Sequence, residues 1–227
     1  MTKNRADKSG ELIFDKIRKR IINWEYPPKH PLREEALSQE FGVSRSPVRK
    51  ALYMLEAGNY IFRIPNRGYF VKPVQKREIT ELYALRSILE LAAAEFALEN
   101  TDLKEALAAL RDPWERVKGA DRLTGEDLAL IDQEFHAGLV GLMGNSMLDF
   151  YFSSINERLF RFRVMDFDET LNSKAIEEVA ENHVGIIDAL LANDRGEAIG
   201  RLKANIAEGL RNVDISLGRA LMRTYEL

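Results

Sequence analysis

Residues 41–55 constrain the fold of this chain more than any other stretch. Their sequence, FGVSRSPVRKALYML, places a glycine turn before a short amphipathic helix. Ser46 is a favourable N-cap because its hydroxyl can accept a hydrogen bond from a free amide, and Pro47 suits the first helical position. Arg45 and Arg49 lie off the apolar stripe, so the helix suits insertion into a DNA major groove. The stripe itself has helical spacing and consists of Val48, Ala51, Leu52 and Leu55.

The segment before this helix predicts the first helix of a helix-turn-helix. Ala36, Leu37 and Phe41 form its apolar side, and Gly42 permits a sharp turn between the two helices. Taken alone, a glycine turn between helices fits an ordinary core hairpin better. The arginines and the segment that follows favour DNA binding instead.

A β-hairpin is predicted after the second helix. Residues 60–64 and 69–71 are β-prone and apolar, and the turn-forming sequence PNRG separates them. Arg67 and Gly68 at the tip can lay a cation and bare backbone along a phosphate or a minor groove. Taken alone, a plain hairpin with a solvated arginine is the simpler interpretation.

Residues 12–71 together resemble the winged helix-turn-helix of GntR-type bacterial transcription regulators. The most specific part is GVSRSPVR at residues 42–49, and Leu32, Leu37, Ala51, Leu52, Leu55 and the Arg67-Gly68 pair also match. The resemblance implies a double-stranded DNA partner. The residues expected to contact it are Arg33, Ser44, Arg45, Ser46, Arg49, Arg67 and Gly68.

Four positions depart from that family pattern. Lys50 stands where the family usually has glutamate, Ser38 where it has alanine, and Lys29 where glycine is common. Glu35 stands where some members carry a DNA-contacting arginine, and Arg33 is the nearby substitute.

The charge distribution separates the chain into two parts. Residues 1–75 hold fifteen lysines and arginines against eight aspartates and glutamates, a net charge of +7. The remainder holds eighteen against twenty-eight, a net charge of −10. A basic first third joined to an acidic remainder is typical of a DNA-binding module followed by a domain with another task.

The length of the chain and the positions of its prolines also indicate two domains. The 227 residues suit two small domains, and six of the seven prolines lie at or before Pro73. We therefore expect a DNA-binding domain at residues 1–73 and an all-helical effector-binding and dimerisation domain at residues 74–227. The fold class is mainly α: a winged helix-turn-helix with a small hairpin, followed by a helical bundle.

Two features that are missing from the sequence, cysteine and a long apolar run, predict where in the cell the protein is found. The chain has no cysteine, which excludes a disulfide scaffold and thiol chemistry and fits a reducing compartment. No uninterrupted apolar run approaches the ~18 residues of a membrane helix, and the N-terminus is polar. We expect a cytoplasmic protein without membrane contact.

Six helices are expected in the second part. The first begins near Glu78, and the second covers residues 102–117 with a bend or break at Pro113. Thr124 should cap the third helix, which ends at Gly144. The remaining three are predicted from residue 146, over residues 175–192, and from residue 195 to the C-terminus.

Polar residues lie on or beside the apolar stripes of three of these helices. Asp132 and His136 are four residues apart on one helix, His183 interrupts a second stripe, and Asn205 a third. Because buried polar groups are costly unless satisfied, these residues indicate one shared pocket. Such a set can hold a metal ion, but the spacing taken alone favours satisfied core histidines over metal ligands.

Residues 78–211 resemble the FCD effector-binding domain of FadR-like GntR regulators. The resemblance is carried by ELYALR at 81–86 with Glu90, by DQEFH at 132–136, and by Asn182-His183 with Ile186, Ala189 and Leu190. It implies a divalent metal such as zinc or nickel, held by an aspartate and three histidines. Asp132, His136 and His183 match three of these ligands, and Asn205 stands at the fourth.

An amide oxygen is a weaker ligand for transition metals than imidazole. The implied site therefore has three alternatives: a weakly bound metal, a harder ion, or a polar pocket without metal. The resemblance also implies a small carboxylate effector. Arg86 is the expected anchor for it, together with Asp132, His136, His183 and Asn205, and Arg158, Arg161 and Arg163 are alternatives.

The sequence thus favours a ligand-responsive DNA-binding transcription regulator, most simply a repressor. One recognition helix reads few bases, so a homodimer on a palindromic operator is expected. The alternative is a metal-dependent hydrolase that uses Asp132, His136 and His183. A hydrolase would also need a general base beside these residues. The nearest candidate, Glu134, should face away from them on its helix.

Overall fold

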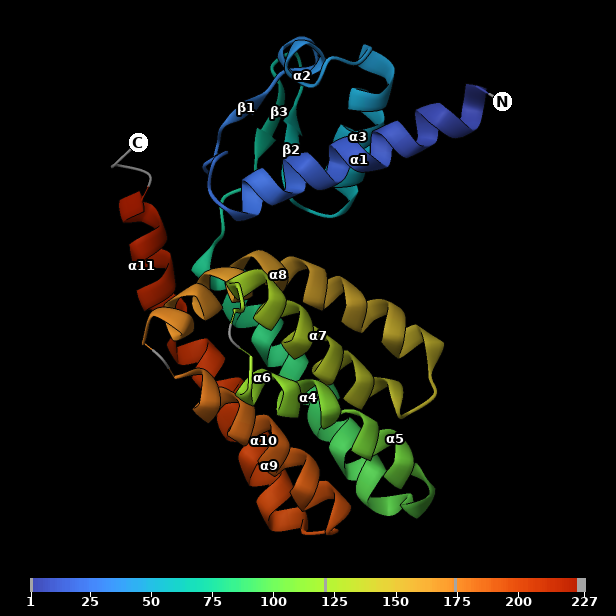
Figure 1. The fold of residues 1–227 in the computed structure, drawn as a ribbon, viewed down its shortest axis with the longest axis vertical. Helices are drawn as coiled ribbons and strands as arrows, with labels where there is room; N and C mark the ends of the chain where they lie inside the picture. The colour runs from blue at the N-terminus through green and yellow to red at the C-terminus, as the bar shows by residue number, and fades with distance from the viewer. Residues whose placement is uncertain (1, 121, 174, 224–227) are drawn as a thin grey trace. The chain divides into compact units, whose positions relative to one another are not determined.

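Two units make up the chain in the computed structural model, which describes residues 2–120, 122–173 and 175–223 (Figure 1). The first comprises Met1–Val74 with Ala220–Leu227, and the second comprises Gln75–Arg219. None of the helices in the described ranges is long and apolar enough to cross a membrane.

The first unit is a winged helix-turn-helix. Its elements are α1 (Thr2–Ile22), β1 (Pro31–Leu32), α2 (Glu34–Phe41), α3 (Arg45–Ala57), β2 (Ile61–Ile64) and β3 (Gly68–Val71). Helix α1 packs against α3, and Ile17, Ile21, Leu52 and Leu55 between them are fully buried. The predicted apolar stripe of α3 is thus its core face. Ala36, expected on the apolar side of α2, is instead exposed.

The predicted hairpin is present as β2 and β3, paired antiparallel with Phe62 opposite Phe70. A third strand was not predicted. Strand β1 pairs with β3, placing Leu32 opposite Tyr69, so the sheet order is β1-β3-β2. The segment between α1 and α2 therefore contributes a strand to the sheet.

The turn between α2 and α3 depends on Gly42, whose φ of 63° is in the left-handed region. The amides of Gly42 and Val43 close the end of α2 by bonding to the carbonyls of Gln39 and Ser38. The predicted Ser46 cap is wrong, because α3 already begins at Arg45 with Ser44 in the cap position. Pro47 still fits there, since none of the first four helical amides has a partner within the helix.

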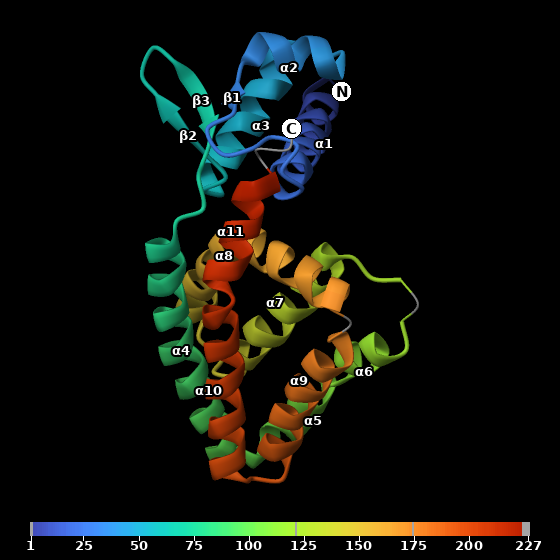
Figure 2. The same ribbon diagram turned by 90° about the vertical axis from the view of Figure 1, so that its left-hand side faces the viewer.

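The second unit is entirely helical in the described ranges (Figures 1 and 2). Helix α7 packs along α8, α10 along both α9 and α4, and α6 against α9. The elements are α4 (Lys76–Glu99), η1 (Thr101–Leu103), α5 (Lys104–Ala109), α6 (Asp112–Lys118), α7 (Gly125–Gly141), α8 (Ser146–Ser173), α9 (Ile176–Leu191), α10 (Arg195–Arg211) and α11 (Val213–Arg223).

Two predicted helices are interrupted. The second is divided into η1, α5 and α6, and Pro113 lies in the first turn of α6, where a proline needs no helical amide partner. The sixth ends at Arg211, and α11 begins at Val213. The predicted cap at Thr124 is confirmed: its hydroxyl and Asp127 form a reciprocal capping box at the start of α7.

The left-handed backbone of Gly42 gives a first prediction about stability, for which Gly200 serves as the matched control. No atom lies within 4 Å of a Cβ added at Gly42 or at Gly200, so neither alanine would clash. Only Gly42 has a positive φ, so Gly42→Ala should destabilise the chain by about 1–2 kcal/mol. Gly200→Ala, inside α10, should stabilise it by roughly 0.5–1 kcal/mol. Urea unfolding of the full chain measures both, and equal midpoints for the two variants would contradict the assigned turn.

Candidate functional site

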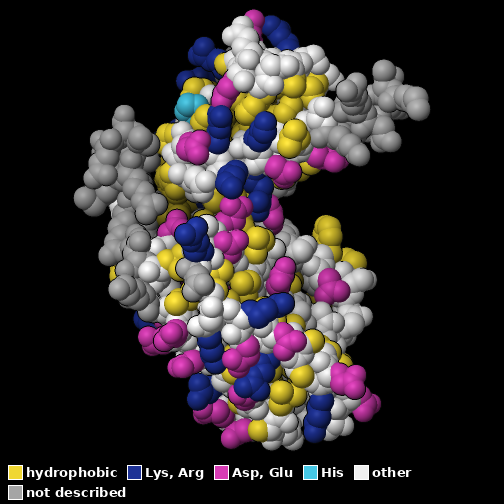
Figure 3. Space-filling model, in the orientation of Figure 1, with side chains coloured by type: hydrophobic (Ala, Val, Ile, Leu, Met, Phe, Trp, Pro, Cys, Tyr) yellow, Lys and Arg dark blue, Asp and Glu magenta, His cyan; other side chains and the backbone are white. Residues whose placement is uncertain are grey.

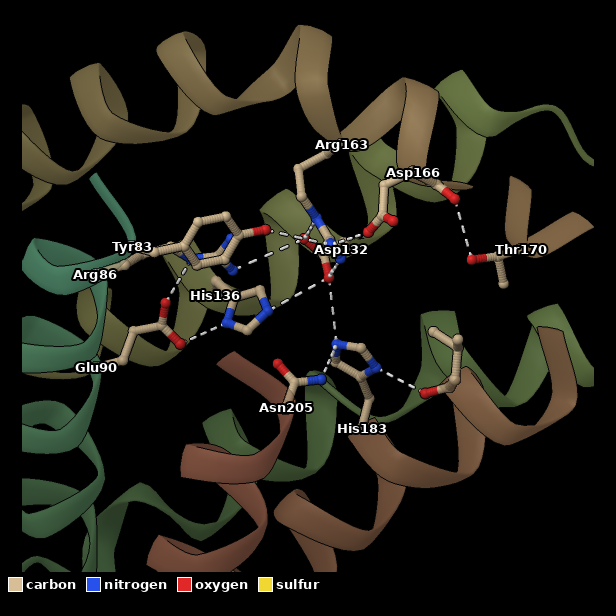
Figure 4. A network of polar contacts seen from close by, with 11 residues as sticks. Tyr83, Arg86, Glu90, Asp132, His136, Arg163, Asp166, Thr170, His183 and Asn205 are labelled. Atoms are coloured by element: carbon tan, nitrogen blue, oxygen red, sulfur yellow. Dashed lines mark hydrogen bonds and ion pairs between the residues drawn. The ribbon is translucent and has the colours of Figure 1, made fainter. Parts of the chain in front are cut away.

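Polar side chains from five helices meet inside the second unit (Figure 4). Asp132, His136 and His183 are each 1% exposed, although a buried polar group needs a partner. The structure thus brings together the polar residues that interrupt the predicted stripes. The cluster consists of Tyr83, Arg86 and Glu90 from α4, Asp132 and His136 from α7, Arg163 and Asp166 from α8, His183 from α9, and Asn205 from α10.

Each histidine is oriented by an acceptor on its Nδ1 side. His136 Nδ1 lies 2.5 Å from the Glu90 carboxylate, and His183 Nδ1 lies 2.7 Å from the carbonyl oxygen of Val179. Since both partners accept hydrogen bonds, both Nδ1 atoms carry the proton. In the neutral ring the Nε2 lone pair is then free, and each Nε2 lies 3.4 Å from Asp132 Oδ1.

Asp132 is the centre of the cluster. Its two oxygens accept from the Arg163 guanidinium, with Nη2 2.8 Å from Oδ1 and Nε 3.2 Å from Oδ2. Arg86 Nη2 lies 3.7 Å from Oδ2. Burial acts to raise the pKa of Asp132, but Arg163 and then His136 together hold this pKa well below its usual range. Asp132 is therefore a buried, ionised carboxylate.

A second buried carboxylate supports the first. Glu90 is fully buried and accepts from Arg86 Nε at 2.7 Å, one turn away on α4. Burial alone would raise the pKa of Glu90, but the charges of His136 and Arg86 lower it. Glu90 thus fixes both the Arg86 guanidinium and the His136 ring.

Aromatic side chains enclose His183. Trp114 stacks on its ring with 3.8 Å between centroids, and Phe135 meets it edge-on at 5.0 Å. Burial lowers the pKa of His183, although Asp132 partly opposes this effect. His183 is therefore neutral near pH 7, and its Nε2 is an acceptor.

A small cavity of about 30 Å³ opens beside the cluster between α8, α9 and α10. Arg163, His183 and Asn205 line it, together with Asp166, Asn182 and Gly209, whereas Arg86 is not among its lining residues. Asn205 Nδ2 lies 3.2 Å from His183 Nε2. The volume suits about two water molecules, so a larger ligand needs side chains to move.

The donor set matches the chemistry of a divalent metal site. The ligand atoms of Asp132, His136 and His183 all lie within 4.8 Å of one another. Tetrahedral zinc, with bonds of about 2.1 Å, places its ligand atoms about 3.4 Å apart. Metal-binding histidines usually donate their other N–H to a carboxylate or a backbone carbonyl, as His136 and His183 do here. These residues therefore fit the metal that the sequence resemblance implies.

The predicted DNA-contacting residues all lie in the first unit and are exposed: Arg33, Ser44, Arg45, Ser46, Arg49, Arg67 and Gly68. Arg45 and Arg49 extend from the first turns of α3. Arg49 bonds Glu34 through Nε at 3.2 Å and Nη2 at 2.9 Å, and Arg45 bonds Glu35 at 3.0 Å. The arginines of the recognition helix are thus held by the start of α2.

Sequence reasoning missed part of the cluster. It treated Arg163 as one of three alternatives on a partly solvated face, but Arg163 is the residue that holds Asp132. The spacing of Arg86 and Glu90 is that of a helical ion pair and could have revealed their contact. No pattern in the sequence places Trp114 on His183.

A winged helix-turn-helix followed by an all-helical unit is the architecture of a transcription regulator. The chain belongs to the GntR family of bacterial regulatory proteins and is a transcriptional regulator with an FCD domain. The gntR family model matches residues 10–71, and the FCD domain model matches residues 81–208.

Relatives with named functions are similar over most of their length. The Nta operon transcriptional regulator of Aminobacter aminovorans is 28% identical over 82% of this chain and 85% of its own. The gluconate operon transcriptional repressor of Bacillus subtilis is 26% identical over 87% and 82%. A GntR regulator structure from Rhodococcus sp. RHA1 shares the fold, with a TM-score of 0.67 and 24% identity over 90% of this chain and 96% of its own.

The buried pairing of Glu90 gives a second prediction. Glu90→Ala leaves the Arg86 guanidinium and His136 Nδ1 buried without an acceptor, and such a loss costs about 3–5 kcal/mol. The matched control is Glu95→Ala, which removes an exposed partner of Arg195 from the same helix. It should change stability little, because surface ion pairs are weak. Thermal unfolding of both variants tests this, and a Glu90→Ala variant as stable as the control would refute the assigned network.

Proposed function

We propose that the protein is a cytoplasmic repressor that binds a palindromic DNA operator as a homodimer and responds to a small carboxylate held in its helical unit. The observation that carries the DNA-binding part is the pair Arg45 and Arg49, exposed on a helix whose other face is the core of the winged unit. The buried Asp132, His136 and His183 cluster carries the ligand-binding part.

The DNA contacts divide into two groups. Arg45 and Arg49, with Ser44 and Ser46, lie at the start of α3, where a recognition helix meets base edges. Arg67 and Gly68 lie at the turn into β3 and are placed to follow the backbone or the minor groove. Arg33, at the start of α2, adds a further cation.

Dimerisation has a candidate surface on the second unit. Leu85 and Ile88 on α4 are 50% and 66% exposed, and Met147, Phe150 and Tyr151 on α8 are 57%, 66% and 57% exposed. On the face drawn in Figure 3, by contrast, charged side chains of both signs are interspersed over the second unit. Apolar groups gathered on neighbouring helices mark an interface, and a second copy of this chain is the partner that a palindromic site requires.

Asp132, His136 and His183 would hold the divalent metal, and Asn205 would stand at the fourth position. The metal would supply a positive centre that binds an anionic effector. The chain's own residues orient the donors: Glu90 and Val179 fix the two imidazole rings, and Trp114 excludes water from one face of His183.

The carboxylate effector would enter through the cavity that Arg163, His183 and Asn205 line. Arg86, the anchor expected from the sequence, is instead 3% exposed and paired with Glu90. We assign it the supporting role of neutralising Glu90 and Asp132. Arg163 is the guanidinium placed to meet a ligand, since it both lines the cavity and binds Asp132.

The third prediction concerns the DNA contacts. A duplex selected from a randomised library by the wild-type chain provides the probe. Arg49→Ala should weaken binding to this duplex roughly tenfold or more, because a lost base contact removes discrimination. Arg45→Ala should also weaken it, and helical content should persist in both. Fluorescence anisotropy measures the affinities.

The control for this experiment is Arg77→Ala, which removes an exposed, glutamate-paired arginine from the second unit. Its DNA affinity should match the wild type. Sedimentation of the wild-type complex should give two chains per duplex. Unchanged affinity for both Arg45→Ala and Arg49→Ala would refute the assigned DNA face, and a lone monomer on the duplex would refute the dimer.

The fourth prediction concerns the metal. Asn205→His replaces a poor oxygen donor by a nitrogen donor beside His183, so affinity for zinc or nickel should rise. His183→Ala should abolish the binding in both backgrounds. Calorimetric titration of chelator-treated protein measures the three affinities. If Asn205→His binds no more tightly than the wild type, the fourth position is not a ligand position.

A further inference from the structure

Arg163 binds the same oxygens that a metal would need. Its Nη2 lies 2.8 Å from Asp132 Oδ1, the oxygen toward which both histidine Nε2 atoms converge, and its Nε takes the other oxygen (Figure 4). A metal–oxygen bond is about 2.0–2.2 Å long. A guanidinium and a divalent cation on one buried carboxylate would repel each other strongly, because little water screens them.

A second place for the Arg163 side chain already exists. Its Nη1 donates to Asp166 Oδ2 at 2.8 Å, one turn further along α8, and its guanidinium carbon lies 4.3 Å from the centroid of the Phe167 ring. Asp166 also accepts from Ser216 on α11 at 3.3 Å. Arg163 can therefore leave Asp132 and keep a carboxylate and an aromatic face as partners.

The charges of the cluster agree with an exchange of partners. Arg86 hydrogen-bonds Glu90 and lies 3.7 Å from Asp132, whereas Arg163 is the cation that hydrogen-bonds both oxygens of Asp132. If a divalent ion took Asp132 while Arg163 stayed, the two cations would share one carboxylate at close range in a buried site. If Arg163 moves to Asp166, each cation has a carboxylate partner.

We propose that Arg163 is an internal competitor for the metal: its guanidinium and a divalent cation are alternative partners of Asp132, and metal binding transfers Arg163 to Asp166. This inference rests on the proposed metal site and adds a residue that sets its affinity. It also means that metal binding frees one edge of Arg163 beside the cavity that would admit the effector.

The test measures zinc affinity of the full chain by calorimetry after chelator treatment. Arg163→Met keeps much of the side-chain volume but removes the competing cation, so zinc should bind roughly tenfold more tightly or better. Arg163→Lys keeps the charge but not the planar fork that takes both oxygens, and its affinity should fall between the two. Arg158→Met removes a charge from the same helix, where exposed Arg158 pairs with half-buried Glu78 outside the cluster, and should match the wild type.

The variants distinguish a failure of the proposed competition from a failure of the proposed metal site. If Arg163→Lys binds zinc only as tightly as the wild type while Arg163→Met binds more tightly, the positive charge at this position is the competitor and the planar fork adds nothing to it. If the wild type binds in a His183-dependent manner and neither Arg163 variant binds more tightly, the metal site stands without the competition. If all variants bind as weakly as His183→Ala, the metal site itself is refuted, and the competition with it.

Cobalt provides a second readout that does not depend on affinity. The visible absorption of bound Co²⁺ reports its coordination, so Arg163→Met and the wild type should give the same spectrum at saturation if both place the ion on Asp132 and the two histidines. Different spectra would show that Arg163 belongs to the metal-bound arrangement and would overturn the transfer to Asp166. If Arg163→Met does not fold, Arg163→Lys carries both measurements.

Discussion

The ionised carboxylate of Asp132, buried among two arginines and two histidines, is the interaction on which the second unit depends. A lone charge in a protein interior is unfavourable by many kilocalories per mole, so its partners must be supplied by the surrounding helices. Arg163 comes from α8, His183 from α9 and Arg86 from α4. The packing of these helices and the neutralisation of Asp132 therefore require each other.

Part of this arrangement could be predicted from the sequence because it follows from helical periodicity. Asp132 and His136 are one turn apart, and His183 and Asn205 interrupt apolar stripes, so all four had to face the interior. The choice of Arg163 over Arg158 and Arg161 could not be predicted. It depends on how the 28-residue helix α8 is rotated against α7, and that rotation is set by packing along its whole length.

In the first unit, too, the sequence predicts local features but not those that depend on packing. The Gly42 turn and the wing were predictable because turn residues and β-prone runs determine them locally. The predicted start of α3 was two residues too late, because Ser44 and Ser46 are equally suitable caps by residue type and the helix begins after the first of them. Lys29 occupies a position with a φ of 67°, which explains why glycine is common there in relatives of this fold.

Hydrogen bonds connect the buried cluster to α11. Asp166, the second partner of Arg163, accepts from Ser216, which lies on α11 just after the interruption at Asn212. Both Arg163 and Asn212 line the cavity. A ligand can shift a regulator only by interacting differently with its two states. An arginine that exchanges one carboxylate for another provides two such states, and the second carboxylate already holds the helix that leads to the C-terminus. The break between α10 and α11, which the sequence did not reveal, thus lies beside the cavity and next to the second partner of Arg163.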